Sequence, residues 1–163
     1  YKADTRLSVY KHSGDQFYLV GRVSLNESYA AVGRLSYPDT QGFIGEVWHR
    51  PDERNYVAFP KDRDDWLDTQ GKSFEFTNEE AGKLKMQTAA MMATKLRRDP
   101  HGDAFGVLCI ECDRRQSTVK AATIDAVRKS PYFHTLTSVL SISLADLTHE
   151  EVKRGFLDRD VTR

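Results

Sequence analysis

Two apolar runs joined by a turn-forming segment constrain the fold of this chain more than any other feature. The first run is Thr88 to Arg97, TAAMMATKLR, and the second is Ala104 to Asp113, AFGVLCIECD. Between them lies RDPHGD, whose Pro, Gly and Asp residues are typical of turns. Because paired runs of this kind around a turn indicate two antiparallel strands, we predict a hairpin in the middle of a sheet.

A second hairpin is predicted near the start of the chain. Arg6 to Lys11 alternates in polarity, HSGDQ forms a turn, and Phe17 to Ser24 is the partner strand. Gly21 inside that strand suggests a bulge or a closely packed neighbour. In an unbroken strand, side chains of equal parity share a face, which would group Phe17, Leu19 and Val23.

Helical signals separate the hairpins and follow the second one. Gly42 to Arg50 places Ile44, Val47 and Trp48 on one helical face, and Pro51 ends it. Asn26 to Thr40 is expected to be a polar connection, Asn55 to Pro60 a strand, and KDRDDWLD a charged loop. TNEE predicts a capped helix from Asn78 to about Lys85. Further helices are expected from Ser117 or Thr118 through Val127, and from Pro131 to Leu147.

Composition limits the possible functions. The 163 residues suggest one domain, and 24 basic residues balance 24 acidic ones. A neutral balance argues against a nucleic-acid partner. Two cysteines fit a reducing compartment, and no run approaches the ~20 apolar residues of a membrane helix. We therefore expect a cytoplasmic location without membrane contact. Because the chain starts at Tyr1, we interpret it as a piece of a longer protein with other domains.

Four stretches of the chain, taken in order, resemble those of a known family. The stretches are RLSVYKHSGDQFYLVGRVS, GFIGEVW followed by NYVAFPKD, TAAMMATKLRRDPHGDAFGVLCIECD, and the closing amphipathic helix. Together they resemble the GAF domain, a sensory module related to PAS domains. The resemblance covers about Arg6 to Leu147. It implies an α+β, GAF-like (profilin-like) fold, with a central antiparallel sheet of about six strands flanked by helices. The opening helix of GAF domains is missing here or lies upstream.

The resemblance also implies the domain limits and a site. Residues 1–147 would form the domain, and residues 148–163 a charged tail or linker helix. A pocket opposite the terminal helices would bind a small ligand, since relatives hold cyclic nucleotides, haem, bilins or small metabolites there. The terminal helices often pair two protomers, so we expect a homodimer through the stripe Phe133, Leu136, Leu140 and Leu147.

No specific cofactor can be assigned from the residues. The Asn-Lys, Phe, Asp-Glu pattern of cyclic-nucleotide-binding relatives is absent, and both cysteines sit on a predicted strand rather than where a bilin attaches. Cys109 and Cys112, three apart on a strand, should point to opposite faces and act as inert core residues. The acidic cluster around Asp65 reads as a solvated loop, and His49 as a residue at a helix end rather than a haem ligand. We predict neither a metal site nor catalytic residues.

The candidate ligand-binding residues combine aromatic, cationic and polar groups. A stacking ring with an arginine would suit a planar anion, although the aromatic residues also fit a core and the arginines a surface. The candidates are Trp48, Phe59, Trp66, Arg22, Arg50, Asp65 and Met91.

Three functions remain open from the sequence. The first is a sensory domain of a signalling protein that binds a small ligand and relays its state through terminal helices. The second is a ligand-free module for dimerisation or protein interaction. The third is a GAF-type methionine-sulfoxide reductase; we expect this domain by itself not to be an enzyme.

Overall fold

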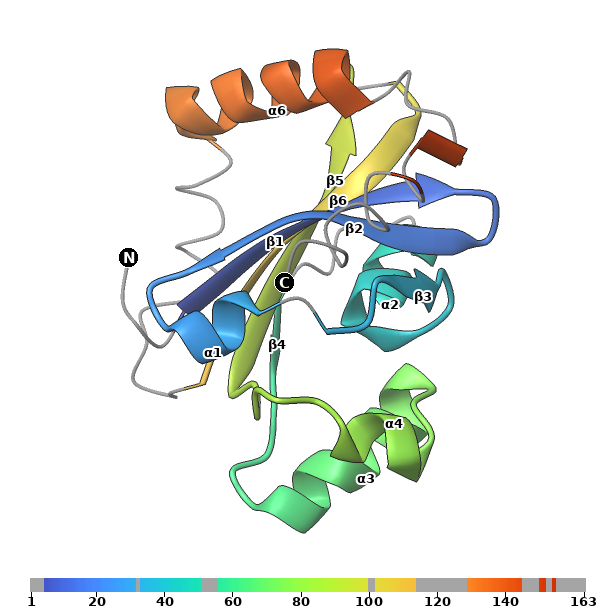
Figure 1. The fold of residues 1–163 in the computed structure, drawn as a ribbon, viewed down its shortest axis with the longest axis vertical. Coiled ribbons are helices and arrows are strands. Elements are labelled where there is room, and N and C mark those ends of the chain that lie inside the picture. The colour runs from blue at the N-terminus through green and yellow to red at the C-terminus, as the bar shows by residue number, and fades with distance from the viewer. Residues whose placement is uncertain are drawn as a thin grey trace.

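Six strands form one antiparallel sheet in the order β3-β2-β1-β6-β5-β4 (Figure 1). The structure is a computed structural model that describes residues 5–31, 33–50, 56–99, 102–113, 129–144, 150, 151 and 154. The predicted α+β class with an antiparallel sheet is confirmed. The strands are β1 (Thr5–Ser13), β2 (Gln16–Ser24), β3 (Ser36–Pro38), β4 (Tyr56–Ala58), β5 (Ala90–Arg97) and β6 (Ala104–Cys112).

Strand β6 lies at the centre of the sheet, as the apolar run predicted. It pairs with β5 in the expected hairpin and with β1 on its other side. The β1 and β6 backbones approach closely at Gly106, where an added Cβ would lie 2.2 Å from the carbonyl oxygen of Tyr10. Only glycine fits this position without a shift of one strand.

A bulge in the first hairpin changes which side chains share a face. Val9 pairs with Gly21 but Tyr10 pairs with Leu19, so Val20 is an extra residue in β2. The predicted bulge is therefore confirmed, but the predicted grouping of Val23 with Phe17 and Leu19 is wrong. The extra residue inverts the alternation, so that Val23 is 51% exposed and Arg22 joins the face of Tyr10.

Helices cover both faces of the sheet. On one face α6 (Pro131–Leu144) packs Phe133, Leu140 and Leu144 against a cluster that includes Leu108. Lys11 from β1 donates to the carbonyl oxygen of Leu144, at the last residue of α6. The other face carries α2 (Gly42–His49), α3 (Arg63–Phe74) and α4 (Asn78–Gly82) (Figure 1). The predicted helices at 42–50 and 78–85 are thus present, ending one and three residues earlier, and the one at 131–147 is present over its described residues, 131–144.

The predicted charged loop at residues 61–68 is instead the start of α3. Asp62 caps this helix by accepting hydrogen bonds from the backbone nitrogens of Asp64 and Asp65. Trp66, Gln70 and Phe74 are its buried residues. Their spacing of four places them on one face, and the charges lie on the others. The loop prediction was wrong because a single narrow buried stripe in a charged segment gives a weak helical signal.

The predicted polar connection at residues 26–40 also contains regular structure. It holds α1 (Glu27–Ala30) and the edge strand β3, which pairs with β2. Strand β4 is shorter than predicted. Three predictions fall outside the described residues: the helix expected after Ser117, the position of Leu147, and nearly all of the charged tail. Within the described part of the chain, no helix is both long and apolar enough to cross a membrane.

Candidate ligand-binding site

A small inner cavity lies between the sheet and the helices α2 and α3. Phe59, Trp66, Met91 and Cys109 are among the residues that line it, and its volume is about 60 Å³. This volume has room for a few water molecules but not for an organic ligand of ordinary size.

Trp66 forms a rigid wall of the inner cavity. Its side chain is 1% exposed, and its indole Nε1 donates to the carbonyl oxygen of Thr88 at 2.9 Å. The guanidinium of Arg63 lies over the outer side of the ring, 4.8 Å from its centroid. With its polar atom satisfied and its ring enclosed, Trp66 acts as a core residue at this site.

A partly buried ion pair lies on the sheet face below both cavities. Arg6 on β1 donates through Nε and Nη2 to Oε2 of Glu111 on β6, at 2.7 and 2.6 Å. The other oxygen of Glu111 accepts from the hydroxyl of Thr88 at 3.1 Å. Burial lowers the pKa of the Arg6 guanidinium, but the attraction and hydrogen bond to Glu111, together with Tyr10 and Cys109, outweigh this and raise the pKa overall. Both carboxylate oxygens of Glu111 therefore have hydrogen-bond partners.

A larger outer cavity, of about 470 Å³, opens beside the inner one and shares several of its walls. This volume is within the usual range for small-molecule sites, roughly 300–1,000 Å³. Aromatic and apolar side chains of Tyr37, Phe76, Leu84 and Met86 line it on the side of the inner cavity. Its polar lining is mostly cationic. The one acidic residue among the described lining residues is Glu80, and the cations are Arg6, Arg22, Arg34, Lys83 and Lys85.

Neutral groups hold the guanidinium of Arg22 in the outer cavity. Its Nε donates to the hydroxyl of Ser8 at 3.1 Å, Nη2 to the hydroxyl of Tyr10 at 3.2 Å and Nη1 to the carbonyl oxygen of Ala31 at 3.3 Å. Burial, followed by the nearby Tyr37, raises the pKa of the Tyr10 phenol, so this partner is uncharged at neutral pH. Arg22 is thus oriented without being neutralised by any described residue.

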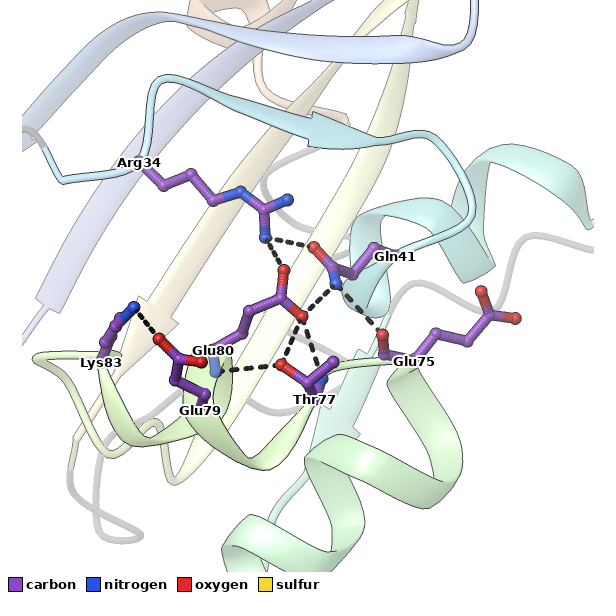
Figure 2. A network of polar contacts seen from close by, with 7 residues as sticks. All are labelled: Arg34, Gln41, Glu75, Thr77, Glu79, Glu80 and Lys83. Atoms are coloured by element: carbon purple, nitrogen blue, oxygen red, sulfur yellow. Dashed lines mark hydrogen bonds and ion pairs between the residues drawn. The ribbon is translucent and has the colours of Figure 1, made fainter.

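Glu80 connects the helical side of the outer cavity to the loop before α2. Figure 2 shows Arg34, Gln41 and Thr77 converging on its carboxylate. Arg34 donates to Oε1 at 2.9 Å, and the Gln41 amide and the Thr77 backbone nitrogen donate to Oε2 at 3.1 and 2.9 Å. The Thr77 and Glu80 contacts form the predicted capping box. These hydrogen bonds lower the pKa of Glu80, Thr77 contributing most.

Four of the seven candidate residues line the two cavities. Phe59, Trp66 and Met91 contribute to the inner cavity, and Arg22 to the outer one. The bulge in β2 brings Arg22 to this face, whereas a regular strand would have directed it away.

The other three candidates lie elsewhere. Trp48 stacks on His12 at 4.2 Å between ring centroids, and Arg50 pairs with Glu46 one turn earlier in α2. Asp65 is exposed in the first turn of α3. None of these three is among the residues that line either cavity. Whether any candidate binds a ligand remains a prediction.

Sequence reasoning missed most cations of the outer cavity. Arg6 appeared as the polar first residue of a strand, Arg34 as part of a connection, and Lys85 as the end of a helix. The capping-box signal at Thr77 and Glu80 was available, but it predicts only the helix start. Nothing local in the sequence shows that Glu80 also contacts Arg34, 46 residues away.

The cysteines lie as the strand alternation predicted. Cys109 shares the sheet face of Ser8 and lines the inner cavity, and Cys112 faces the opposite side. Burial, followed by the charge of Glu111, raises the pKa of the Cys109 thiol. The two thiols therefore do not meet across the sheet, and Cys109 lacks the low pKa of a nucleophilic cysteine.

Known structures show what this arrangement is similar to. No family model matches the chain, and no curated protein does. The GAF domain of a phosphoenolpyruvate-protein phosphotransferase from Coxiella burnetii is 16% identical, with a TM-score of 0.52 over 88% of this chain and 76% of that one. The corresponding Acinetobacter domain is 14% identical, with a TM-score of 0.49 over 89% and 76%. A type II free methionine-R-sulfoxide reductase from Thermoplasma acidophilum is 16% identical, with a TM-score of 0.44 over 94% and 81%. The chain has the fold of a GAF domain, which confirms the resemblance seen in the sequence.

Proposed function

We propose that this domain is a sensory or regulatory module that binds a small molecule in the outer cavity. The observation that carries the proposal is a cavity of about 470 Å³ with apolar walls and several convergent charged groups. Concave sites with this combination of apolar surface and a few placed polar groups are typical of small-molecule binding. The GAF fold supports the same reading, because it places the cavity opposite α6.

Strand β1 offers a direct route from the cavity to α6. Its alternate residues Arg6, Ser8 and Tyr10 lie on the cavity face, whereas Val9 and Lys11 lie on the face that α6 covers. A ligand that favours one position of β1 would therefore also affect the contact between Lys11 and the end of α6. Such a relay can shift the helix only by the difference in ligand affinity between the two states.

The binding step is tested by filling the cavity. Gly33 lines the outer cavity, and an added Cβ there meets no atom within 4 Å, so Gly33→Trp adds bulk with little strain. Small molecules that co-purify with the full chain would be identified by native mass spectrometry and returned to stripped protein in a titration. Gly33→Trp should abolish binding. Gly82→Trp is the matched control, because Gly82 is equally unobstructed and lies outside the cavity lining.

Two outcomes would refute small-molecule binding at this place. One is that no compound co-purifies and none from a broad metabolite library raises the melting temperature. The other is that a compound binds Gly33→Trp and the unmodified chain equally well.

An exposed apolar face on α6 supports a second candidate function, self-association or protein interaction. The structure packs the predicted dimer residues Phe133 and Leu140 against the sheet and leaves Leu136 at the exposed side. Beside Leu136, three more apolar side chains are exposed: Tyr132 (85%), Val139 (54%) and Ile142 (78%). A dimer through α6, if it forms, would use these residues more than the predicted stripe.

Light scattering after size exclusion tests this second function. The double variant Val139→Asp with Ile142→Asp should dissociate a dimer, and His134→Asp, at an exposed position on another side of the same helix, should not. A monomeric wild-type chain at all accessible concentrations would rule out self-association.

A further inference from the structure

The charges around the outer cavity specify the kind of molecule that it would hold. Two of its five lining cations are neutralised by carboxylates from just outside the lining, Arg6 by Glu111 and Lys83 by Glu79. Arg34 is paired with Glu80. Arg22 and Lys85 remain, and neither has a carboxylate partner in the described part of the chain. The cavity therefore carries excess positive charge although the chain as a whole is neutral.

Arg22 is the better placed of these two cations. A guanidinium has five N–H groups, and the contacts with Ser8, Tyr10 and Ala31 use one on each nitrogen. One N–H on each terminal nitrogen is left without a partner among the described residues. A pair of N–H groups on neighbouring nitrogens is what a carboxylate or phosphate binds in a bidentate manner. Because Arg22 is already oriented, little side-chain entropy would be lost on binding.

Arg34 can add a second contact at the rim. Its hydrogen bonds to Gln41 and Glu80 both leave from Nη1, and its side chain is 38% exposed. Its guanidinium also lies over the Tyr37 ring, 4.9 Å from the centroid. Nε and Nη2 are therefore available for an anion, while Glu80 competes for the charge.

We infer that the outer cavity binds a small organic anion, whose carboxylate or phosphate group is held by Arg22 and Arg34 while its apolar body lies against Tyr37 and Phe76. This inference rests on the proposed function and names the ligand class for the same site. The apolar part of the ligand is assigned to the apolar part of the cavity lining, which also contains the two arginines. That apolar part consists of Tyr37, Phe76, Leu84 and Met86. Anion binding weakens the hold of Glu80 on Arg34, and hence the connection between α4 and the segment before β3.

Calorimetric titration of the full chain with matched probe pairs tests the inference. The pairs are benzoate with benzamide, succinate with succinamide and phenyl phosphate with phenol, and inorganic phosphate is titrated alone. We expect the charged member of at least one pair to bind at least about tenfold more tightly than its neutral partner. Preference for carboxylate or for phosphate identifies which of the two groups the site takes. Binding of inorganic phosphate as tight as that of phenyl phosphate overturns the role given to the aromatic walls.

Four variants locate the anion. Arg22→Gln should weaken the charged probe at least about tenfold, and Arg50→Gln, which removes a guanidinium outside both cavities, should leave it unchanged. Lys85→Glu, at an exposed position that does not threaten folding, should weaken it by about two- to fivefold. Glu80→Gln keeps a side chain suited to the capping box but removes the competing charge, so it should tighten binding about threefold.

The inference is overturned if neutral and charged probes bind equally, if no pair binds at millimolar concentration, or if Arg22→Gln binds the charged probe normally. Its failure is distinguishable from failure of the proposed function. A neutral compound that co-purifies, and that Gly33→Trp excludes, would leave the sensory role standing while removing the anion.

Discussion

The ion pair between Arg6 and Glu111 should be one of the most costly polar contacts to break. Both side chains are well enclosed, with 13% and 5% of their surfaces exposed, and two hydrogen bonds of 2.7 and 2.6 Å join them. Glu111→Gln keeps the shape but removes the charge, and it leaves the guanidinium of Arg6 without a counter-ion among the described residues.

The expected loss follows from the environment of the pair. Removing one partner of a buried pair costs about 3–5 kcal/mol, and the residual exposure of Arg6 favours the lower end, about 3 kcal/mol. At about 2–4 °C per kcal/mol for a chain of this size, the melting temperature should fall by roughly 6–12 °C. Urea unfolding followed by circular dichroism measures the free energy directly, and an unchanged m-value would show that the unfolded state is not altered.

A double-mutant cycle separates the pair from its surroundings. Arg6→Met and Glu111→Leu should each be destabilising, whereas the double variant should cost less than the sum of the two, because apolar side chains of similar volume can replace a buried pair at little cost. The matched control is the exposed pair of Lys72 and Asp68 on α3, whose removal should cost under about 1 kcal/mol. Strict additivity, or a loss below about 1 kcal/mol for Glu111→Gln, would refute the reasoning that burial makes this pair strong.

Three further predictions concern other parts of the structure. Partial burial raises the pKa of Asp39, but the hydrogen bonds and charges of His12 and His49 together outweigh it and lower this pKa below its ordinary value of 3.8. The stabilisation by Asp39 is therefore complete above pH 3.8 and is lost as the pH falls through the lower pKa of the folded state. The melting temperatures of wild type and Asp39→Asn should converge as the pH falls below about 4. A constant difference between the two melting temperatures would contradict this. Gly45→Ala should lower the melting temperature measurably in calorimetry, since its Cβ would lie 2.6 Å from the backbone of the preceding turn, and a neutral result would show that the turn yields. Cys109 should resist iodoacetamide at pH 8 until the chain is unfolded, because burial raises the pKa of its thiol; rapid labelling of native protein in a mass-spectrometric time course would disprove it.

Local signals predicted much of the framework. The hairpin of β5 and β6 follows from two apolar runs around a Pro- and Gly-containing turn, and α4 from its capping box. The opposite orientation of Cys109 and Cys112 follows from strand alternation alone. In each case, residues near one another in sequence determine the structure, so the pattern can be read without knowing the rest of the fold.

Two errors in the prediction arose where packing outweighs local pattern. Helix α3 is polar around most of its circumference, and what secures it is the burial of Trp66 and Phe74 against the sheet side of the domain. The edge strand β3 is three residues long and exists through its pairing with β2. Neither segment has enough apolar residues of its own for the local sequence pattern to predict its secondary structure.

The amino-acid sequence by itself determined that this chain forms an antiparallel α+β sheet with β6 at its centre, and that its cysteines lie on opposite faces. Only the tertiary structure decided where a ligand would bind. The outer cavity assembles Arg6, Arg22, Arg34 and Lys85 from separate segments, and a one-residue bulge determines that Arg22 faces it. Such a site depends on long-range pairing and register, which change the environment of a side chain without changing the residues next to it in sequence.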